Sequence, residues 1–209
     1  MTEARIIFKD VKAVLFDLDG VLIDSYSGWF RLFNDALKHF GFEQITERTF
    51  RKHWGQSTEE DVRIFMPGKT VDQVRTYFQK HFPQYLFYLK INPMAMRTLH
   101  ALSELGLKLA CVTNSHRKIV LEILGIYHLA GYFDVILTVD DVKKPKPAPD
   151  ILLEAYRLLK VELNQSLFIG DTLIDKKAGD RAGVAFVGYR IRADTTVDNL
   201  SDFYDLLAK

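Results

Sequence analysis

Short apolar segments alternate with longer amphipathic ones along this sequence, and this alternation restricts the fold class more than any other feature. Each apolar segment is too short for a helix and is bounded by polar or turn residues, which is typical of a buried strand. Helix patterns, with apolar residues three and four positions apart, occupy most of the intervals. Strands that alternate with helices predict an α/β fold, a Rossmann-like parallel sheet covered by helices. The predicted strands are residues 13–16, 107–112, 135–139, 167–169 and 184–187.

Start and stop residues delimit the predicted helices. Asn92-Pro93 begins one helix and Gly106 ends it. Ser115 can cap the next helix, which is expected to end at Gly125. Two further helix patterns cover residues 149–159 and the segment after Ser201.

One interval between predicted strands is far too long for a simple crossover. About ninety residues separate Asp17 from Leu107, whereas a parallel crossover needs only about a dozen. We therefore predict that residues 23–92 are an inserted helical domain, here called the cap, and that residues 1–22 and 93–209 form the α/β core. The first cap helix carries an apolar stripe that Gly41 closes. Because ligands bind at the carboxyl ends of strands in open α/β sheets, an insertion at that edge is expected to act as a lid.

Polar residues follow four of the predicted strands. The carboxyl ends of parallel strands meet at one edge of a sheet, so these side chains are expected to converge. Four carboxylates without a histidine or cysteine favour a hard, oxygen-binding ion such as Mg²⁺. The residues are Asp17 and Asp19 after the first strand, Thr113 and Asn114 after the second, Lys146 after the third, and Asp171 and Asp175 after the fourth.

This set of side chains can transfer a phosphoryl group, because a carboxylate can attack phosphorus to form an aspartyl-phosphate. The obstacle is charge: two unit charges about 4 Å apart repel by roughly 4 kcal/mol at an effective dielectric near 20. A magnesium ion and Lys146 can offset that repulsion. Thr113 and the amides after it, at the start of a helix, add hydrogen-bond donors. Asp19, two residues after the candidate nucleophile, can protonate the leaving oxygen and later deprotonate water.

With these motifs in this order, the sequence resembles the haloacid dehalogenase superfamily. The resemblance covers essentially the whole chain and is closest to the branch of phosphoglycolate phosphatases and β-phosphoglucomutases, which carry a helical cap of the C1 type after the first strand. It implies the fold of that superfamily, an α/β core with an inserted α-helical cap. It also implies a magnesium-dependent phosphatase that hydrolyses a small phosphorylated metabolite through an aspartyl-phosphate intermediate.

The resemblance implies a role for each core motif. Asp17 is expected to be the nucleophile and Asp19 the general acid and base. Thr113 and Asn114 are expected to bind the transferring phosphoryl group. Lys146 is expected to bridge that group to Asp17, so Thr113 and Lys146 join the two aspartates as catalytic residues.

The resemblance also implies where metal and substrate bind. Mg²⁺ would be held by the Asp17 carboxylate, the Asp19 backbone carbonyl and Asp171, with Asp175 supporting through water or hydrogen bonds. Gly55, in the cap, is expected to lie beside the substrate. His53, close to Gly55, is the histidine with the best prospect of a role in the site.

Two neighbouring lysines compete for the third motif, because Lys144 and Lys146 each precede a proline. The family pattern Lys-Pro-x-Pro-Asp matches residues 146–150, which favours Lys146. Lys144 stays open as the alternative.

Three other functions agree less well with these residues. A phosphomutase is the nearest alternative; the mutases carry Lys-Gly-x-Ser-Arg-Glu in the cap, whereas residues 54–59 here read Trp-Gly-Gln-Ser-Thr-Glu without either cation. Arg51, Lys52 or Arg63 could substitute for those cations. Dehalogenation is disfavoured by Asp19, since that chemistry needs no second acid and no metal. A catalytically silent binding protein is disfavoured because no motif residue is missing.

Composition limits the partners and the compartment. The formal net charge is +1, from 28 basic and 27 acidic residues, which gives no electrostatic argument for nucleic acid or a membrane surface as partner. Cys111 is the single cysteine, so no intrachain disulfide is possible and a reducing compartment is favoured. Arg5 and Lys9 interrupt the N-terminal segment, and no apolar run approaches the ~18 residues of a membrane span. We expect a cytoplasmic protein, either monomer or homodimer.

Overall fold

The computed structural model describes residues 10–207, so Arg5 and Lys9 lie outside the described residues. At its centre is a six-stranded sheet in the order β5-β4-β1-β6-β7-β8, in which every neighbouring pair is parallel. The predicted α/β class is therefore confirmed. The strands are β1 (Ala13–Phe16), β4 (Lys108–Val112), β5 (Val135–Leu137), β6 (Ser166–Gly170), β7 (Ala185–Tyr189) and β8 (Thr195–Val197).

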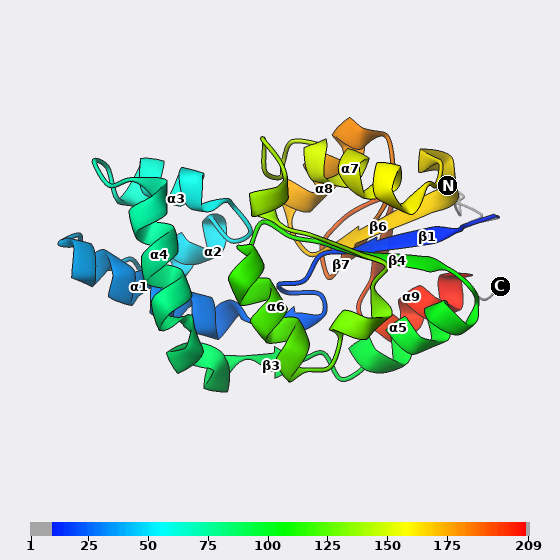
Figure 1. Cartoon of the computed structure of the whole chain (residues 1–209), viewed down its shortest axis with the longest axis horizontal. Coiled ribbons are helices and arrows are strands. Elements are labelled where there is room, and N and C mark those ends of the chain that lie inside the picture. The colour runs from blue at the N-terminus through cyan, green and yellow to red at the C-terminus, as the bar shows by residue number, and fades with distance from the viewer. Residues whose placement is uncertain (1–9, 208–209) are drawn as a thin grey trace.

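Helices cover both faces of the sheet (Figure 1). Side chains alternate along β1, so Val14 and Phe16 pack on one face while Ala13 and Leu15 pack on the other. The first face is covered by α5 (Ala95–Glu104), α6 (Arg117–Ile126) and α9 (Leu200–Leu207). The second face is covered by α7 (Asp150–Leu159) and α8 (Leu173–Ala182). The sheet is therefore packed between two apolar layers, one on each face. Cys111 is buried in the first layer.

Some predicted boundaries were wrong. The third strand stops at Leu137, and Val139–Asp141 form a 3-10 helix, η3. The cap position of α6 is His116 and not Ser115, and α6 runs past Gly125 to Ile126. The structure also contains β8, which the sequence analysis did not predict, and three further short 3-10 helices: η1 (Phe82–Tyr88), η2 (Ala130–Tyr132) and η4 (Leu163–Gln165).

Four helices between β2 (Ile23–Asp24) and β3 (Lys90–Ile91) form a bundle beyond one end of the sheet, at the left of Figure 1. They are α1 (Tyr26–Phe40), α2 (Glu47–Lys52), α3 (Thr58–Phe65) and α4 (Val71–His81). The bundle has an aromatic centre in which the Phe33 ring contacts those of Phe50, Phe65 and Phe78. The first helix ends at Gly41, as predicted, with a left-handed φ of 84°.

The chain leaves and re-enters the core through a short ribbon. Strand β2 (Ile23–Asp24) pairs antiparallel with β3 (Lys90–Ile91), so that Ile23 lies opposite Ile91. The helical bundle is therefore attached to the core by two adjacent crossings.

Within residues 10–207, every helix is too short or insufficiently apolar to span a lipid bilayer.

Candidate active site

Strand register brings the polar motifs together. Phe16 at the end of β1 pairs with Cys111 of β4 on one side and with Ile169 of β6 on the other. The residues that follow these three strands therefore meet at one edge of the sheet, where the bundle of α1–α4 also lies.

Lys146 is at the centre of this meeting point. Its Nζ atom donates hydrogen bonds to Asp17 Oδ1 at 2.8 Å, to Asp175 Oδ1 at 2.7 Å and to the Val112 carbonyl at 3.1 Å. The side chain is only 2% exposed, and the two carboxylates raise the pKa of Lys146 above its usual range even though burial opposes the charge. Lys144 is exposed. A buried ammonium is therefore placed against Asp17.

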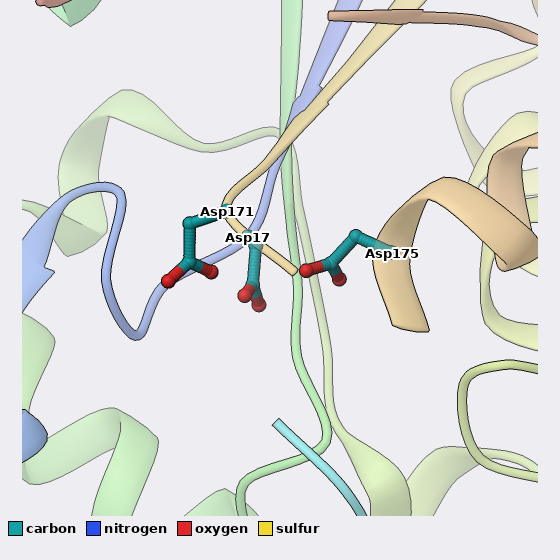
Figure 2. A group of neighbouring side chains, drawn as sticks. All are labelled: Asp17, Asp171 and Asp175. Carbon is teal, nitrogen blue, oxygen red and sulfur yellow. The ribbon is translucent and has the colours of Figure 1, made fainter. Parts of the chain in front are cut away.

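Three carboxylates form an acidic cluster beside Lys146. Asp17, Asp171 and Asp175 offer oxygen atoms that all lie within 4.8 Å of one another. Figure 2 shows Asp17 between the other two, with Asp175 approaching from the first turn of α8. Burial, followed by the neighbouring charges of the cluster, raises the pKa of Asp17 well above its usual value and that of Asp171 to about 7. The single positive charge of Lys146 cannot neutralise all three carboxylates of the cluster.

The acidic cluster fits a divalent cation. Asp171 Oδ1 is buried and has no hydrogen-bond partner among residues 10–207. A buried acceptor without a partner is costly, and a hard cation would satisfy it. Carboxylate oxygens are the ligands that Mg²⁺ prefers. Asp171, Asp17 and Asp175 are therefore suited to magnesium.

Two glycines allow the carboxylates to approach this closely. A Cβ atom on Gly20 would lie 1.9 Å from Asp171 Oδ2, and Gly20 also has a left-handed φ of 87°. A Cβ on Gly170 would lie 2.4 Å from the Cβ of Asp175. Any larger residue at either position would displace a carboxylate of the acidic cluster.

Asp175 is held in place by both of its oxygens. Oδ1 accepts from Lys146, and Oδ2 accepts from the Thr172 amide at 3.1 Å and from the Thr172 hydroxyl. In return, the Thr172 hydroxyl accepts from the Asp175 amide, which completes a capping box at the start of α8. A local helix-start motif thereby orients a residue of the acidic cluster.

Asp19 does not point into the acidic cluster. Its Oδ1 accepts from the Ser25 hydroxyl and from Trp29 Nε1 at 3.1 Å, and its Oδ2 accepts from the Ser115 hydroxyl at 2.6 Å. Ser25 and Trp29 lie at the start of α1, so Asp19 joins the core to the helical bundle. Hydroxyls can accept as well as donate, so Ser25 and Ser115 can serve Asp19 in either protonation state.

Thr113 and Asn114 both line the cavity described below, but their side chains are already engaged. The Thr113 hydroxyl accepts from the Ser115 amide at 3.1 Å. The Asn114 side chain accepts from the Lys146 amide and donates to the Lys146 carbonyl, both at 2.8 Å. Asn114 therefore fixes the backbone that carries Lys146.

Three further contacts join the helical bundle to the edge of the sheet. Trp54 Nε1 donates to Asp171 Oδ2 at 3.1 Å. The Gly55 carbonyl accepts from Asn114 Nδ2 at 3.0 Å. The Thr58 hydroxyl lies 3.0 Å from Nε2 of the buried His116, whose Nδ1 is 2.8 Å from Asp140 Oδ1.

A cavity lies between the bundle and the sheet edge, and we call it the cap–core cavity. Asp17, Asp19, Thr113, Asn114 and Lys146 line its core side. Its bundle side includes Gly55 and His53, so every residue predicted to be catalytic or to bind substrate lies on this one cavity. The cluster residues Asp171 and Asp175 are outside that lining but adjoin Asp17.

Sequence reasoning missed several residues of this site. Trp29 has the spacing of an apolar helix residue and Ser115 that of a helix cap, yet both donate to Asp19. His116 and Asp61 were not singled out, although both line the cap–core cavity. A Ser-His pair directly after the second strand was the one available signal, since polar residues at that edge face the site.

Known proteins resemble this chain along most of its length. The sequence model of the family described as "Haloacid dehalogenase-like hydrolase" matches residues 14–189. A phosphoglycolate phosphatase from Aquifex aeolicus is 34% identical over 174 residues, which cover 83% of this chain and 82% of the relative. A pyrophosphatase PpaX from Halalkalibacterium halodurans is 28% identical over 199 residues, which cover 94% of this chain and 93% of that protein.

A solved structure of similar fold also resembles this chain. The crystal structure of a predicted phosphoglycolate phosphatase from Haemophilus somnus superimposes with a TM-score of 0.79 at 26% identity. The match covers 95% of this chain and 99% of the other.

Proposed function

Because this chain belongs to the family of haloacid dehalogenase-like hydrolases, we propose that it is a magnesium-dependent phosphatase that hydrolyses a small phosphate monoester through an aspartyl-phosphate on Asp17. The observation that carries the proposal is the position of the Lys146 ammonium, bonded to Asp17 and Asp175 beside the unpartnered Oδ1 of Asp171. Such a site is suited to neutralising a phosphate ester next to a carboxylate nucleophile.

In the first step, an oxygen of Asp17 attacks phosphorus and the bond to the leaving oxygen breaks. Lys146 occupies Oδ1 of Asp17, whereas Oδ2 has no hydrogen-bond partner among the described residues. Asp19 donates the proton that the leaving oxygen takes up, which makes the leaving group an alcohol. Thr113 and the backbone amides that follow it bind the phosphoryl oxygens, and Asn114 holds Lys146 in position.

In the second step, water attacks the aspartyl-phosphate and Asp19 takes the proton from that water. The bond between Asp17 and phosphorus breaks, which releases inorganic phosphate and restores the carboxylate. Asp19 is suited to both steps because its two serine partners can donate or accept.

Magnesium, held by Asp17, the Asp19 carbonyl and Asp171 with support from Asp175, would supply positive charge to the phosphoryl oxygens. Asp171 contributes the unpartnered oxygen, and Trp54 orients its second oxygen. Asp175 is restrained by Lys146 and Thr172.

We further propose that residues 23–92 are the cap and act as a lid over the core of residues 1–22 and 93–209. The chain passes between the two parts at the ribbon of β2 and β3, and Gly55 and Trp54 contact the motif residues directly. Closure of such a lid excludes water from the phosphoryl group.

A phosphomutase would need cations in the cap for a second phosphate. Arg51, Lys52 and Arg63 are the candidates, and none of the three lines the cap–core cavity. The phosphatase is therefore the better-supported of the two.

The proposal is tested by the phosphoenzyme. Wild-type protein is expected to hydrolyse p-nitrophenyl phosphate only with Mg²⁺, and an acid quench during turnover should trap a phosphoryl label that hydroxylamine removes, as expected for an acyl phosphate. Asp17→Asn keeps the shape of the side chain but should show neither label nor turnover. A label that persists in Asp17→Asn would place the covalent step on another residue.

A further inference from the structure

The cap side of the cap–core cavity has a chemistry that phosphoryl transfer does not require. It is lined by the rings of Phe33, Phe50, Phe78 and Trp54, and among them lies the carboxylate of Asp61. The group that leaves the phosphate must occupy this side, because the core side is taken up by the phosphoryl-transfer residues.

Cations are scarce around this cavity. Lys146 is the one lysine or arginine among the described residues that line it, and Lys146 is already bonded to Asp17 and Asp175. Arg51 pairs with Glu47 at 2.9 Å and Arg63 with Glu60 at 2.7 Å, and their side chains are 67% and 70% exposed. Lysine and arginine side chains of the cap are therefore absent from the cavity lining, so none of them lies beside the leaving group there.

Asp61 is fixed by a chain of hydrogen bonds. Gln56 Nε2 donates to Asp61 Oδ1 at 2.6 Å, and Gln56 Oε1 lies 3.1 Å from His53 Nδ1, which donates to it. Asp61 Oδ2 has no hydrogen-bond partner within residues 10–207. Burial raises the pKa of Asp61 to about 7, and the hydrogen bond from Gln56 opposes this only in part.

We infer that the substrate of this enzyme is a phosphate monoester whose leaving alcohol carries a hydrogen-bond donor, a hydroxyl or an ammonium group, and no carboxylate or second phosphate. The inference rests on the proposed phosphatase function. A donor satisfies Asp61 Oδ2, and the surrounding rings accommodate a short carbon chain or an ammonium group. A second anion would meet Asp61 without a counter-charge.

The inferred substrate differs from the substrates after which the relatives are named. Phosphoglycolate leaves a carboxylate-bearing group, and pyrophosphate leaves a phosphate. Both leaving groups are anionic, and both are expected to bind poorly beside Asp61.

Four esters of two-carbon alcohols test the inference with size held constant. They are ethyl phosphate, 2-hydroxyethyl phosphate, phosphoethanolamine and phosphoglycolate, each measured as kcat/KM with saturating Mg²⁺. At least one donor-bearing ester should exceed phosphoglycolate about tenfold or more and should also exceed ethyl phosphate, because a site built for a hydrogen bond rejects analogues that cannot make it. Pyrophosphate, added as a fifth substrate, should rank with phosphoglycolate.

Asp61→Asn tests the residue. The variant keeps shape but loses charge, so the ratio of kcat/KM for phosphoethanolamine to that for ethyl phosphate should fall. The corresponding ratio for 2-hydroxyethyl phosphate should change less, because an amide oxygen still accepts from a hydroxyl. Glu60→Gln, at the neighbouring position outside the cavity lining, is the matched control and should leave every ratio unchanged.

Several results would overturn the inference. Phosphoglycolate or pyrophosphate as the best substrate would do so, as would ethyl phosphate equal to the donor-bearing esters, or a phosphoethanolamine ratio that does not fall in Asp61→Asn. The proposed phosphatase function fails in a different way, namely if wild-type protein does not turn over p-nitrophenyl phosphate at all.

Discussion

Replacement of Lys146 by alanine is expected to lower kcat/KM a hundredfold or more. The ammonium donates to Asp17 and Asp175 from a position that is 2% exposed. Loss of one preorganised donor from a transition state costs roughly 3 to 4 kcal/mol. Removal of one partner from a buried ion pair costs about 3–5 kcal/mol of stability in addition. The Asp17 carboxyl can take up a proton, which reduces the second loss.

The assay separates the two losses. kcat/KM for p-nitrophenyl phosphate is measured well below the melting temperature, and Tm is measured with and without Mg²⁺. Lys146→Met, which retains most of the side-chain volume, distinguishes a missing charge from a cavity. Lys144→Ala is the matched control, because Lys144 is exposed and two residues away, and it should stay within a fewfold of wild type. Magnesium should recover part of the lost Tm, since it supplies charge to the same carboxylates.

Either of two results would refute the reasoning. If Lys144→Ala were the more damaging variant, the motif lysine would have been assigned to the wrong position. If Lys146→Ala retained kcat/KM within fivefold while remaining folded, the ammonium between Asp17 and Asp175 would not contribute to the transition state.

Three further predictions follow from the same contacts. Magnesium at 100 times its Kd should stabilise the wild type by about 2.7 kcal/mol, seen as a rise in Tm, and Asp171→Ala should lose that rise. Gln56→Ala, which loses the hydrogen bond to Asp61, should lower kcat/KM for the preferred ester far more than for p-nitrophenyl phosphate. Trp54→Phe, which loses the hydrogen bond to Asp171, should lower kcat/KM for all esters alike and raise the Mg²⁺ concentration required for activity. The pKa of Asp61 is raised to about 7, so the stability that its protonated form contributes is complete below pH ~4 and is lost as the pH rises through ~7. Denaturant titrations with saturating Mg²⁺ should therefore show a weaker fall in the free energy of unfolding between these pH values for Asp61→Asn than for wild type. An equal fall in both proteins would contradict the burial of this carboxyl.

The α/β class could be predicted from the sequence because the central strands are buried on both faces and therefore read as continuous apolar runs. Strand β8 escaped prediction because Thr195–Val197 is a three-residue edge segment with polar neighbours. Its pairing with β7 is a tertiary interaction that no local pattern encodes.

The motif residues were predictable for a similar reason, since all of them follow strands of one parallel sheet. The partners of Asp19 were not, because Trp29 and Ser25 reach it only once α1 is packed against the core. Asp61 lies in the first turn of α3, where an acidic residue is expected because it interacts favourably with the helix dipole. Its sequence position therefore did not suggest a role in the site. Its position in the cavity depends on how the cap helices fold over the sheet edge.

The β2–β3 ribbon has a consequence for folding and for the exchange of parts between proteins. Ile23 lies opposite Ile91, and paired residues on antiparallel strands are only about 5 Å apart. The segment of about seventy residues between these strands therefore starts and finishes at almost one point. Once these helices and the ribbon have formed, pairing of β1 with β4 has to close only the short segments on the core side of the ribbon and α5, so its loop-closure entropy depends little on the length of the segment between β2 and β3. Helices beyond this ribbon can be lengthened, shortened or grafted from another protein without a change in the register of the central sheet.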